Sequence, residues 1–311
     1  MGMLIEGQWT DNEEAYRRGG AFVRAAAAFR ALVTADGSSP FPAEAGRYHL
    51  YVANPCPWCH RTMIFRALKK LEGAVSISFV DPLMLEGGWR FAAPDPITGA
   101  TFLHQIYAMA DPHYTGRVSV PVLWDRKTAT IVNNESSEIV RMFNSAFDAF
   151  TDDRTDYYPA ALRAEIDAVN ARIYETVNNG VYRCGFARDQ AIYETAVTEL
   201  FETLDWLEER LATRRYLLGD TITEADWRLF PTLFRFDAVY YALFKCNLRH
   251  VYEYPALWSY ARALYQTPGV TETCDLAQCK RHYYGSLRMV NPTGIVPKGP
   301  QIDFGAPHDR R

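Results

Sequence analysis

The alternation of apolar and polar residues changes its period about halfway along the chain. In the first half, short runs of β-branched and aromatic residues predict strands. These runs span residues 48–53, 75–80, 118–124 and 128–132. Between the first two, residues 57–71 place apolar side chains at helical spacing, and Gly73 is in position to end that helix.

Two stretches around these strands are irregular. Residues 1–45 are polar and interrupted by Gly and Pro, and we interpret them as an N-terminal extension with one short helix at about residues 21–32. Residues 83–116 are rich in Gly, Pro and aromatic residues. They predict a long loop, which is uncommon in a compact domain unless it is functional.

The elements after this loop complete the first domain. Residues 125–127 predict a turn that joins two strands into a hairpin, and Asn133 and Asn134 offer an N-cap for a helix beginning near Glu135. A β-α-β unit followed by a hairpin and a helix is typical of a thioredoxin-like α/β domain, which we assign to residues 46–150.

The second half of the chain is helical. Four windows carry the 3.6-residue apolar period, namely residues 160–178, 189–212, 224–244 and 254–265. Thr223 and Asp226 have the spacing of a capping box at the start of the third window. We assign residues 151–311 to an all-α helical domain, with an extended tail in the Pro- and Gly-rich stretch 291–300.

Charge and hydropathy exclude several classes of protein. The net charge of the 311 residues is −4 and no run of Lys and Arg exceeds two residues, which argues against a nucleic-acid partner. No window approaches the roughly 20 apolar residues of a membrane span. The first 14 residues include acidic side chains and lack the apolar core of a signal peptide, so we expect a cytoplasmic protein.

The sharpest local motif is NPCPWCH at residues 54–60, where a predicted strand turns into a predicted helix. A thiol at this position lies beside the unpaired N–H groups and the positive end of the helix dipole. Both favour the thiolate, so we expect Cys56 to have a lowered pKa and to be nucleophilic. Pro57 fits the first helical position, and Cys59 lies one turn further in.

Three other interpretations of this motif fit the sequence less well. A buried, inert pair of cysteines is possible in principle, but the placement between strand and helix argues against it. Covalent haem attachment also uses Cys-x-x-Cys-His, yet it requires export. A zinc site would need two more ligands, and Cys274 and Cys279 are distant and awkwardly spaced, so we expect no metal. A thiol–disulfide or glutathione-linked cysteine fits best.

Two further features fit a thiol–peptide site. Val120 and Pro121 stand at the start of a predicted strand; in thioredoxin-like domains such a proline is cis, and the preceding backbone pairs with a peptide-like ligand. An edge-strand proline is the plainer alternative. Glu135 and Ser136 open a helix whose N–H groups and hydroxyl could hold the α-carboxylate of a γ-glutamyl group, although the same residues also make an ordinary cap.

Together these residues resemble a glutathione transferase, and longer strings resemble the Xi class, the glutathionyl-hydroquinone reductases. The resemblance runs from about residue 20 to residue 300. The strings are NPCPWCHRT at 54–62, GWRF at 88–91, VPVLWD at 120–125, NNES at 133–136, NGVYRCGFA at 179–187, RFDAVY at 235–240, FKCN at 244–247 and NPTGIVP at 291–297.

The resemblance implies a reaction and a set of residues. The Cys56 thiolate attacks the sulfur of a glutathionyl-hydroquinone, releases the hydroquinone, and is regenerated by a second glutathione, a ping-pong scheme. By position, glutathione is held by Trp89, Arg117, Val120, Glu135 and Ser136. Tyr182, Tyr240 and Tyr283 border the site of the aromatic quinol-type substrate; the adjacent Tyr241 and Tyr284 are alternatives for the last two. The family also implies a homodimer.

Three positions depart from the family pattern. Cys59 stands where most members have Ala, and Leu243 and Leu287 stand where His is expected. Cys59 opens a rival activity, a dithiol disulfide oxidoreductase using Cys56 and Cys59. A non-catalytic protein that binds hydrophobic ligands is a second rival, and conventional conjugation of glutathione is disfavoured because a cysteine occupies the place of an activating Ser or Tyr.

Overall fold

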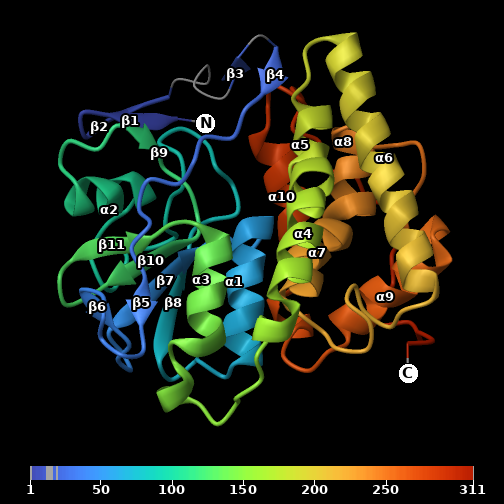
Figure 1. Cartoon of the computed structure of the whole chain (residues 1–311). Coiled ribbons are helices and arrows are strands. Elements are labelled where there is room, and N and C mark those ends of the chain that lie inside the picture. The colour runs from blue at the N-terminus through green and yellow to red at the C-terminus, as the bar shows by residue number, and fades with distance from the viewer. Residues whose placement is uncertain (1, 12–16, 19, 311) are drawn as a thin grey trace. The chain divides into compact units, whose positions relative to one another are not determined.

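A computed structural model of the chain describes residues 2–11, 17–18 and 20–310 (Figure 1). The described residues fall into two compact units. The first contains Arg24–Thr155 and the described residues before 12; the second contains Arg17–Val23 and the chain from Asp156 onward. The N-terminal residues are therefore distributed over both units.

The core of the first unit is a four-stranded sheet in the order β11-β10-β7-β8. Its strands are β7 (Tyr48–Val52), β8 (Val75–Phe79), β10 (Val122–Asp125) and β11 (Thr130–Asn133). β7 and β8 are parallel, whereas β10 is antiparallel to both of its neighbours. All five residues of β7 are buried, as expected for a central strand. The four strands predicted from the sequence are confirmed: β7 and β8 end one residue earlier than predicted, whereas β10 and β11 begin later and end one residue later.

Helices α1 (Pro57–Leu68) and α3 (Ser136–Ser145) lie side by side (Figure 1). α1 begins at Pro57, as the sequence indicated, but Gly73 does not end it. The helix stops at Leu68, and Lys70 adopts a left-handed conformation with φ of 50°. A lysine thus occupies a backbone position that glycine more often takes.

The predicted loop at residues 83–116 contains regular structure that the sequence analysis missed. α2 (Leu103–Ala110) lies within it and packs near β11. β9 (Gly116–Arg117) ends it and pairs with β1 (Met3–Ile5), which also pairs with β2 (Gln8–Thr10).

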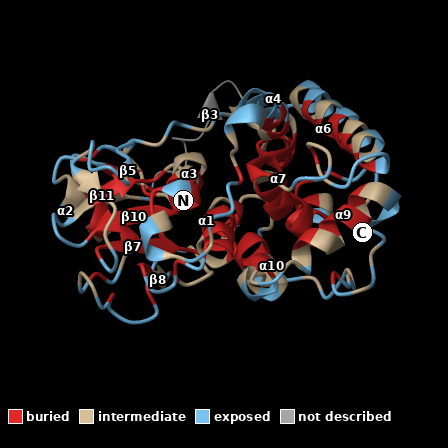
Figure 2. Ribbon diagram, turned by 60° about the horizontal axis from the view of Figure 1, so that its bottom comes forward, coloured by how far each residue is buried: buried red, intermediate tan, exposed pale blue. Residues whose placement is uncertain are grey.

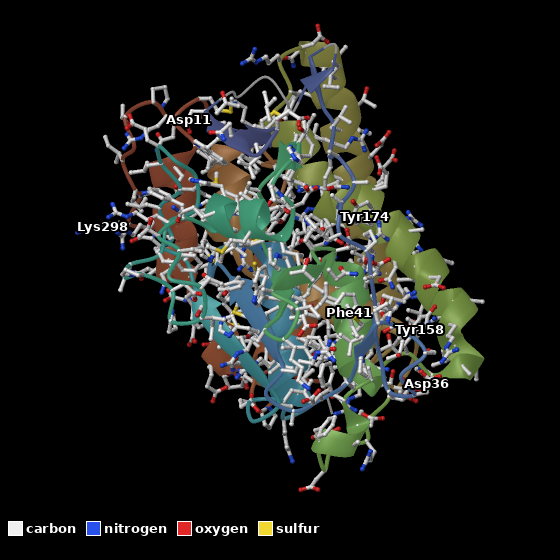
Figure 3. All side chains as sticks on the ribbon, turned by 90° about the vertical axis from the view of Figure 1, so that its left-hand side faces the viewer. Asp11, Asp36, Phe41, Tyr158, Tyr174 and Lys298 are labelled. Carbon is white, nitrogen blue, oxygen red and sulfur yellow. The ribbon has the colours of Figure 1, made fainter. Side chains whose placement is uncertain are left out.

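The prediction of a helix at residues 21–32 was wrong. The chain there runs extended beside β11: the Ala31 N–H donates to the Val132 carbonyl, and the Asn134 N–H donates to the Phe29 carbonyl, both at 3.1 Å. In this segment, hydrogen bonds to β11 take the place of the hydrogen bonds that a helix would make. The segment also covers the edge of the sheet, which would otherwise be open to pairing with another chain. The short parallel pair β5 (Val33–Thr34) and β6 (Phe41–Pro42) follows; Phe41 is labelled in Figure 3.

The second unit is helical. Its helices are α4 (Arg163–Ile173), α5 (Gly180–Gly185), α6 (Gln190–Ala212), α7 (Glu224–Arg235), α8 (Tyr241–Leu243), α9 (Pro255–Tyr265) and α10 (Leu276–Ser286). Two predicted helices, 160–178 and 224–244, are not continuous, because a π-helical turn follows α4 at Tyr174–Asn178 and another follows α7 at Phe236–Tyr240.

α7 is the buried centre of this unit and packs against α4, α9 and α10, whereas α6 exposes one of its faces (Figure 2). The predicted capping box is present: the Thr223 N–H and hydroxyl both donate to the Asp226 carboxylate, at 2.7 and 3.0 Å. As predicted, residues 291–300 form neither helix nor strand.

A two-stranded hairpin from the N-terminal region belongs to the helical unit. It consists of β3 (Arg17–Arg18) and β4 (Ala21–Phe22). The Gly20 carbonyl accepts a 3.3 Å hydrogen bond from the Arg188 N–H, just before α6, which fixes the hairpin against this unit.

Candidate active site

Cys56 is the N-cap residue of α1, with extended backbone angles (φ −76°, ψ 122°). Its carbonyl accepts the first helical hydrogen bond, from the His60 N–H at 3.0 Å. The residue is 9% exposed and stands next to the N–H groups of the first helical turn. This is the setting that lowers a thiol pKa and makes a nucleophile.

The Cys56 sulfur lies 3.7 Å from the carbonyl oxygen of Val120. The Val120–Pro121 peptide bond is cis, which confirms the expectation for that proline. The structure thus brings together two of the residues selected from the sequence, the thiol and the backbone expected to pair with a peptide-like ligand.

Two guanidinium groups lie close to the start of α1. The Trp58 ring is contacted by Arg24 at 4.7 Å and by Arg61 at 4.5 Å, measured from Cζ to the ring centre. The first turn of α1, which is described in full, carries no acidic residue. The charged side chains around Trp58, two residues after Cys56, are therefore cations.

Cys59 is in a different environment from Cys56. Its side chain is fully buried, and its sulfur accepts a 3.4 Å hydrogen bond from the Ala53 N–H at the end of β7. The buried position follows from the helical spacing, because a residue three positions after the N-cap turns toward the sheet.

The remaining residues expected to hold glutathione are spread over the first unit. Trp89 is buried, and its carbonyl accepts from the Leu103 N–H at the start of α2. Arg117 lies in β9, and its carbonyl accepts from the Tyr114 hydroxyl at 2.9 Å.

Glu135 is the N-cap of α3, a role that the sequence analysis gave to Asn133 or Asn134. The Glu135 carboxylate accepts from the N–H and hydroxyl of Ser137, at 3.0 and 2.8 Å, and Ser136 is buried at the first helical position. Asn133 does not cap the helix itself. Its side-chain oxygen accepts a 2.7 Å hydrogen bond from the N–H of Glu135, the N-cap residue.

One group of positioning residues was missed. The buried Tyr107 hydroxyl donates to the Ser119 carbonyl at 2.8 Å and accepts from the Asn134 side chain at 3.0 Å. The Tyr107 hydroxyl thereby links Ser119, the residue before Val120, to Asn134, which lies just before α3. The apolar spacing within residues 103–110 was a signal for the helix that carries Tyr107.

In the helical unit, the three expected tyrosines meet. The Tyr283 hydroxyl lies 2.5 Å from that of Tyr182 and 3.1 Å from that of Tyr240. Tyr240 and Tyr283 are buried, and Tyr182 is half-buried. Burial, with the neighbouring Tyr182 phenol as the next cause, raises the pKa of both buried tyrosines well above the usual value for a phenol. Both therefore stay protonated at neutral pH and can donate hydrogen bonds.

The adjacent tyrosines face other partners. The Tyr241 ring stacks on His250 with centroids 3.5 Å apart, and the Tyr284 hydroxyl donates to the Ala238 carbonyl at 3.4 Å. Leu243 and Leu287, the two departures from the family pattern, are both buried.

Phenylalanines that the sequence analysis did not select surround the tyrosine cluster. The Phe244 ring packs against Tyr182, Tyr240 and Tyr283, with centroids 5.5 to 5.8 Å apart. Phe22 and Phe186 stack on Tyr182 from another side. The cluster is therefore a set of phenol donors in an aromatic setting, which suits a flat aromatic ring that carries hydroxyl groups.

Neither a metal site nor a membrane span is evident in the part of the chain that the structure describes. No group of three or more His, Cys, Asp and Glu side chains there could hold a metal ion. None of the described helices is long and apolar enough to cross a membrane.

Comparison with known proteins matches both halves of the chain. The family model described as glutathione S-transferase, N-terminal domain, matches residues 55–146, and the one described as glutathione S-transferase, C-terminal domain, matches residues 190–263. With a thiol at the N-cap of α1, a cis proline beside it and a helical second unit, this chain belongs to the glutathione S-transferases.

Curated relatives place it within that family. The chain is 53% identical to the glutathionyl-hydroquinone reductase PcpF of Sphingobium chlorophenolicum over 96% of both chains. It is 50% identical to YqjG of Escherichia coli, a glutathionyl-hydroquinone reductase, over 100% of this chain and 98% of that protein. The protein is a member of the glutathionyl-hydroquinone reductases, as the sequence resemblance indicated.

Solved structures agree with this assignment. The glutathione-bound structure of the Escherichia coli YqjG has a TM-score of 0.92 at 48% identity, covering 99% of each chain. A Xi-class glutathione transferase from Natrialba magadii has a TM-score of 0.94 at 45% identity, covering 100% of this chain and 97% of that one.

Proposed function

We propose that the protein catalyses the reductive removal of glutathione from glutathionyl-hydroquinones, with Cys56 as the nucleophile. The observation that carries this proposal is the position of the Cys56 sulfur, at the N-cap of α1 and 3.7 Å from the Val120 carbonyl. A helix N-terminus stabilises the thiolate, and the adjacent backbone offers a partner for the peptide part of glutathione.

The reaction has two half-reactions. In the first, the Cys56 thiolate attacks the sulfur bonded to the ring, a disulfide forms between Cys56 and glutathione, and the carbon–sulfur bond breaks. Its electron pair goes to the ring carbon, which takes a proton to give the hydroquinone. In the second, a glutathione thiolate attacks the mixed disulfide, which releases glutathione disulfide and restores the Cys56 thiolate.

The tyrosine cluster is the proposed source of that proton. Tyr182 is the outermost of the three, and its hydroxyl is hydrogen-bonded to the protonated Tyr283. A phenol whose neighbours donate to it loses a proton at a lower cost, so Tyr240 and Tyr283 support a proton transfer from Tyr182 to the ring carbon.

Glutathione is the proposed thiol, held by Trp89, Arg117, Val120, Glu135 and Ser136. At the start of α3, the positive end of the helix dipole and the Ser136 hydroxyl suit the α-carboxylate of the γ-glutamyl residue. The Glu135 carboxylate already accepts from Ser137, which holds it in position to accept from the γ-glutamyl ammonium as well.

We further propose that the protein acts as a cytoplasmic homodimer that needs no metal. The six cysteines are all free thiols, which fits a reducing compartment. Light scattering of the purified protein tests the dimer, and cell fractionation tests the location.

The decisive experiment is mass spectrometry after a single turnover with a glutathionyl-hydroquinone and no added thiol. The expected result is one glutathione on Cys56 and an equal amount of free hydroquinone. An oxidised Cys56–Cys59 pair would instead indicate the dithiol route, and an unmodified protein with intact substrate would contradict the proposed function.

A further inference from the structure

Three aromatic rings at one side of the tyrosine cluster are nearly parallel. Phe22 stacks on Tyr182 with centroids 5.8 Å apart and planes inclined by 23°, and on Phe186 at 5.5 Å and 28°. Tyr182 and Phe186 are themselves 6.2 Å apart at 24°. All three residues belong to the helical unit.

Phe22 reaches this position from the N-terminal hairpin, far from the other two rings in sequence. It lies in β4 and pairs with Arg17 of β3. Two residues before it, the Gly20 carbonyl accepts a hydrogen bond from the Arg188 N–H. The backbone at the end of the hairpin is therefore fixed to the segment between α5 and α6, which limits the freedom of the Phe22 ring.

Exposure separates the cluster into an inner and an outer part. Tyr240 and Tyr283 are buried, whereas Phe22 and Tyr182 remain half-buried. Phe22 and Tyr182 are therefore stacked members of the cluster that a flat ring can reach from solvent. Parallel and offset aromatic rings attract one another beyond the effect of buried area alone.

We propose that Phe22 is a specificity-determining residue, which selects aromatic leaving groups by packing against the hydroquinone ring. This inference rests on the proposed function. Phe22 carries no group that takes part in the bond changes, so its contribution is to binding of the ring and to its orientation at Tyr182. Substrates without a ring gain nothing from it.

The test compares two substrates that the same thiol attacks at a glutathionyl sulfur. One is a glutathionyl-hydroquinone; the other is the mixed disulfide of glutathione and 2-mercaptoethanol, whose leaving group has no ring. In Phe22→Ala, we expect KM for the hydroquinone substrate to rise about threefold to tenfold, with the kinetics of the mixed disulfide unchanged. Phe22→Leu keeps apolar bulk without a flat ring. It should also raise KM for the hydroquinone substrate alone, by a smaller factor than Phe22→Ala.

Phe41→Ala is the matched control, since Phe41 is also a half-buried phenylalanine but lies in β6 of the first unit. Thermal unfolding of each variant establishes that it is folded. Equal losses on both substrates, or an equal rise of KM in Phe41→Ala, would overturn the inference. A wild-type protein that cleaves the mixed disulfide but leaves the glutathionyl-hydroquinone intact would instead contradict the proposed function, and the inference with it.

Discussion

The phenolic oxygens of Tyr240 and Tyr283 lie 3.1 Å apart, and Tyr283 also bonds Tyr182, so a single hydroxyl joins all three tyrosines. Tyr240 comes from the π-helical turn after α7 and Tyr283 from α10. A π-helical turn changes the direction in which later side chains point, and such turns are frequent at functional sites. The geometry makes Tyr283 the central member of the cluster.

Removing the Tyr283 hydroxyl should affect both stability and turnover. Tyr283→Phe deprives the buried Tyr240 hydroxyl of a partner, which we expect to cost about 1–3 kcal/mol in the free energy of unfolding. If the cluster delivers the proton to the ring, kcat should fall about tenfold to a hundredfold. Tyr284→Phe is the control, because its 3.4 Å bond is long; equal effects of the two changes would argue against a special role for Tyr283.

The two cysteines of the motif should behave differently. Cys56→Ser should reduce hydroquinone release by about a thousandfold or more, because it removes the nucleophile. Cys59→Ala should retain turnover, since Cys59 is fully buried and the proposed scheme does not use it. Steady-state assays of hydroquinone release make the comparison, and a Cys59→Ala variant that stalls as a Cys56–glutathione adduct would favour the dithiol route.

The arginines around Trp58 should support the Cys56 thiolate. Arg24→Gln removes one of the two cations on that ring, so the thiol pKa should rise and alkylation by iodoacetamide near pH 6.5 should slow about twofold to threefold. The difference should shrink in high salt, because Arg24 is partly exposed. Arg30→Gln, a change to an arginine paired with Glu138, is the control and should leave the alkylation rate unchanged.

A buried histidine should make stability depend on pH. Burial lowers the pKa of His49 to about 4, from a usual value near 6.5, while its Nδ1 lies 2.7 Å from the Ser76 hydroxyl. Between these two values the unfolded chain binds a proton that the folded chain does not, so the free energy of unfolding should fall as the pH drops from about 6.5 to about 4. We expect this residue to account for about 2–3 kcal/mol of that decline.

Urea unfolding at a series of pH values checks the His49 prediction. His49→Gln should flatten the curve over this range, because glutamine does not titrate there. The same slope in the variant and in the wild type would show that other groups cause the pH dependence.

Gly185 should not tolerate a side chain. A Cβ at this position would overlap the ring of Phe244, which packs against the three tyrosines. Gly185→Ala should therefore lower the free energy of unfolding by about 1–3 kcal/mol and displace Phe244. Gly180→Ala in the same helix is the control, since its Cβ would have only ordinary contacts, and thermal unfolding of the two variants should differ clearly.

Local signals identified the central elements of the first unit and the strand–helix junction that carries Cys56. The alternation in residues 48–53 marked a buried strand, and the motif at 54–60 placed Cys56 at the N-cap of α1, because both are consequences of nearby residues. Local signals failed where a segment distant in sequence offers the backbone alternative hydrogen bonds. The Ala-rich stretch at 21–32 favours a helix by itself but runs extended, because hydrogen bonds to β11 are available to it.

The sequence alone determined the strand–helix junction at Cys56, the capping box at Thr223 and, through resemblance, the family. The tertiary structure decided which groups meet: the Val120 carbonyl beside the thiol, the three phenols around Tyr283, and Phe22 of the N-terminal hairpin against Tyr182. The physical reason is the sequence separation of the residues that interact. Caps and periodicity depend on residues a few positions apart, whereas these contacts join segments distant in sequence, and only the packing of the folded chain brings them together.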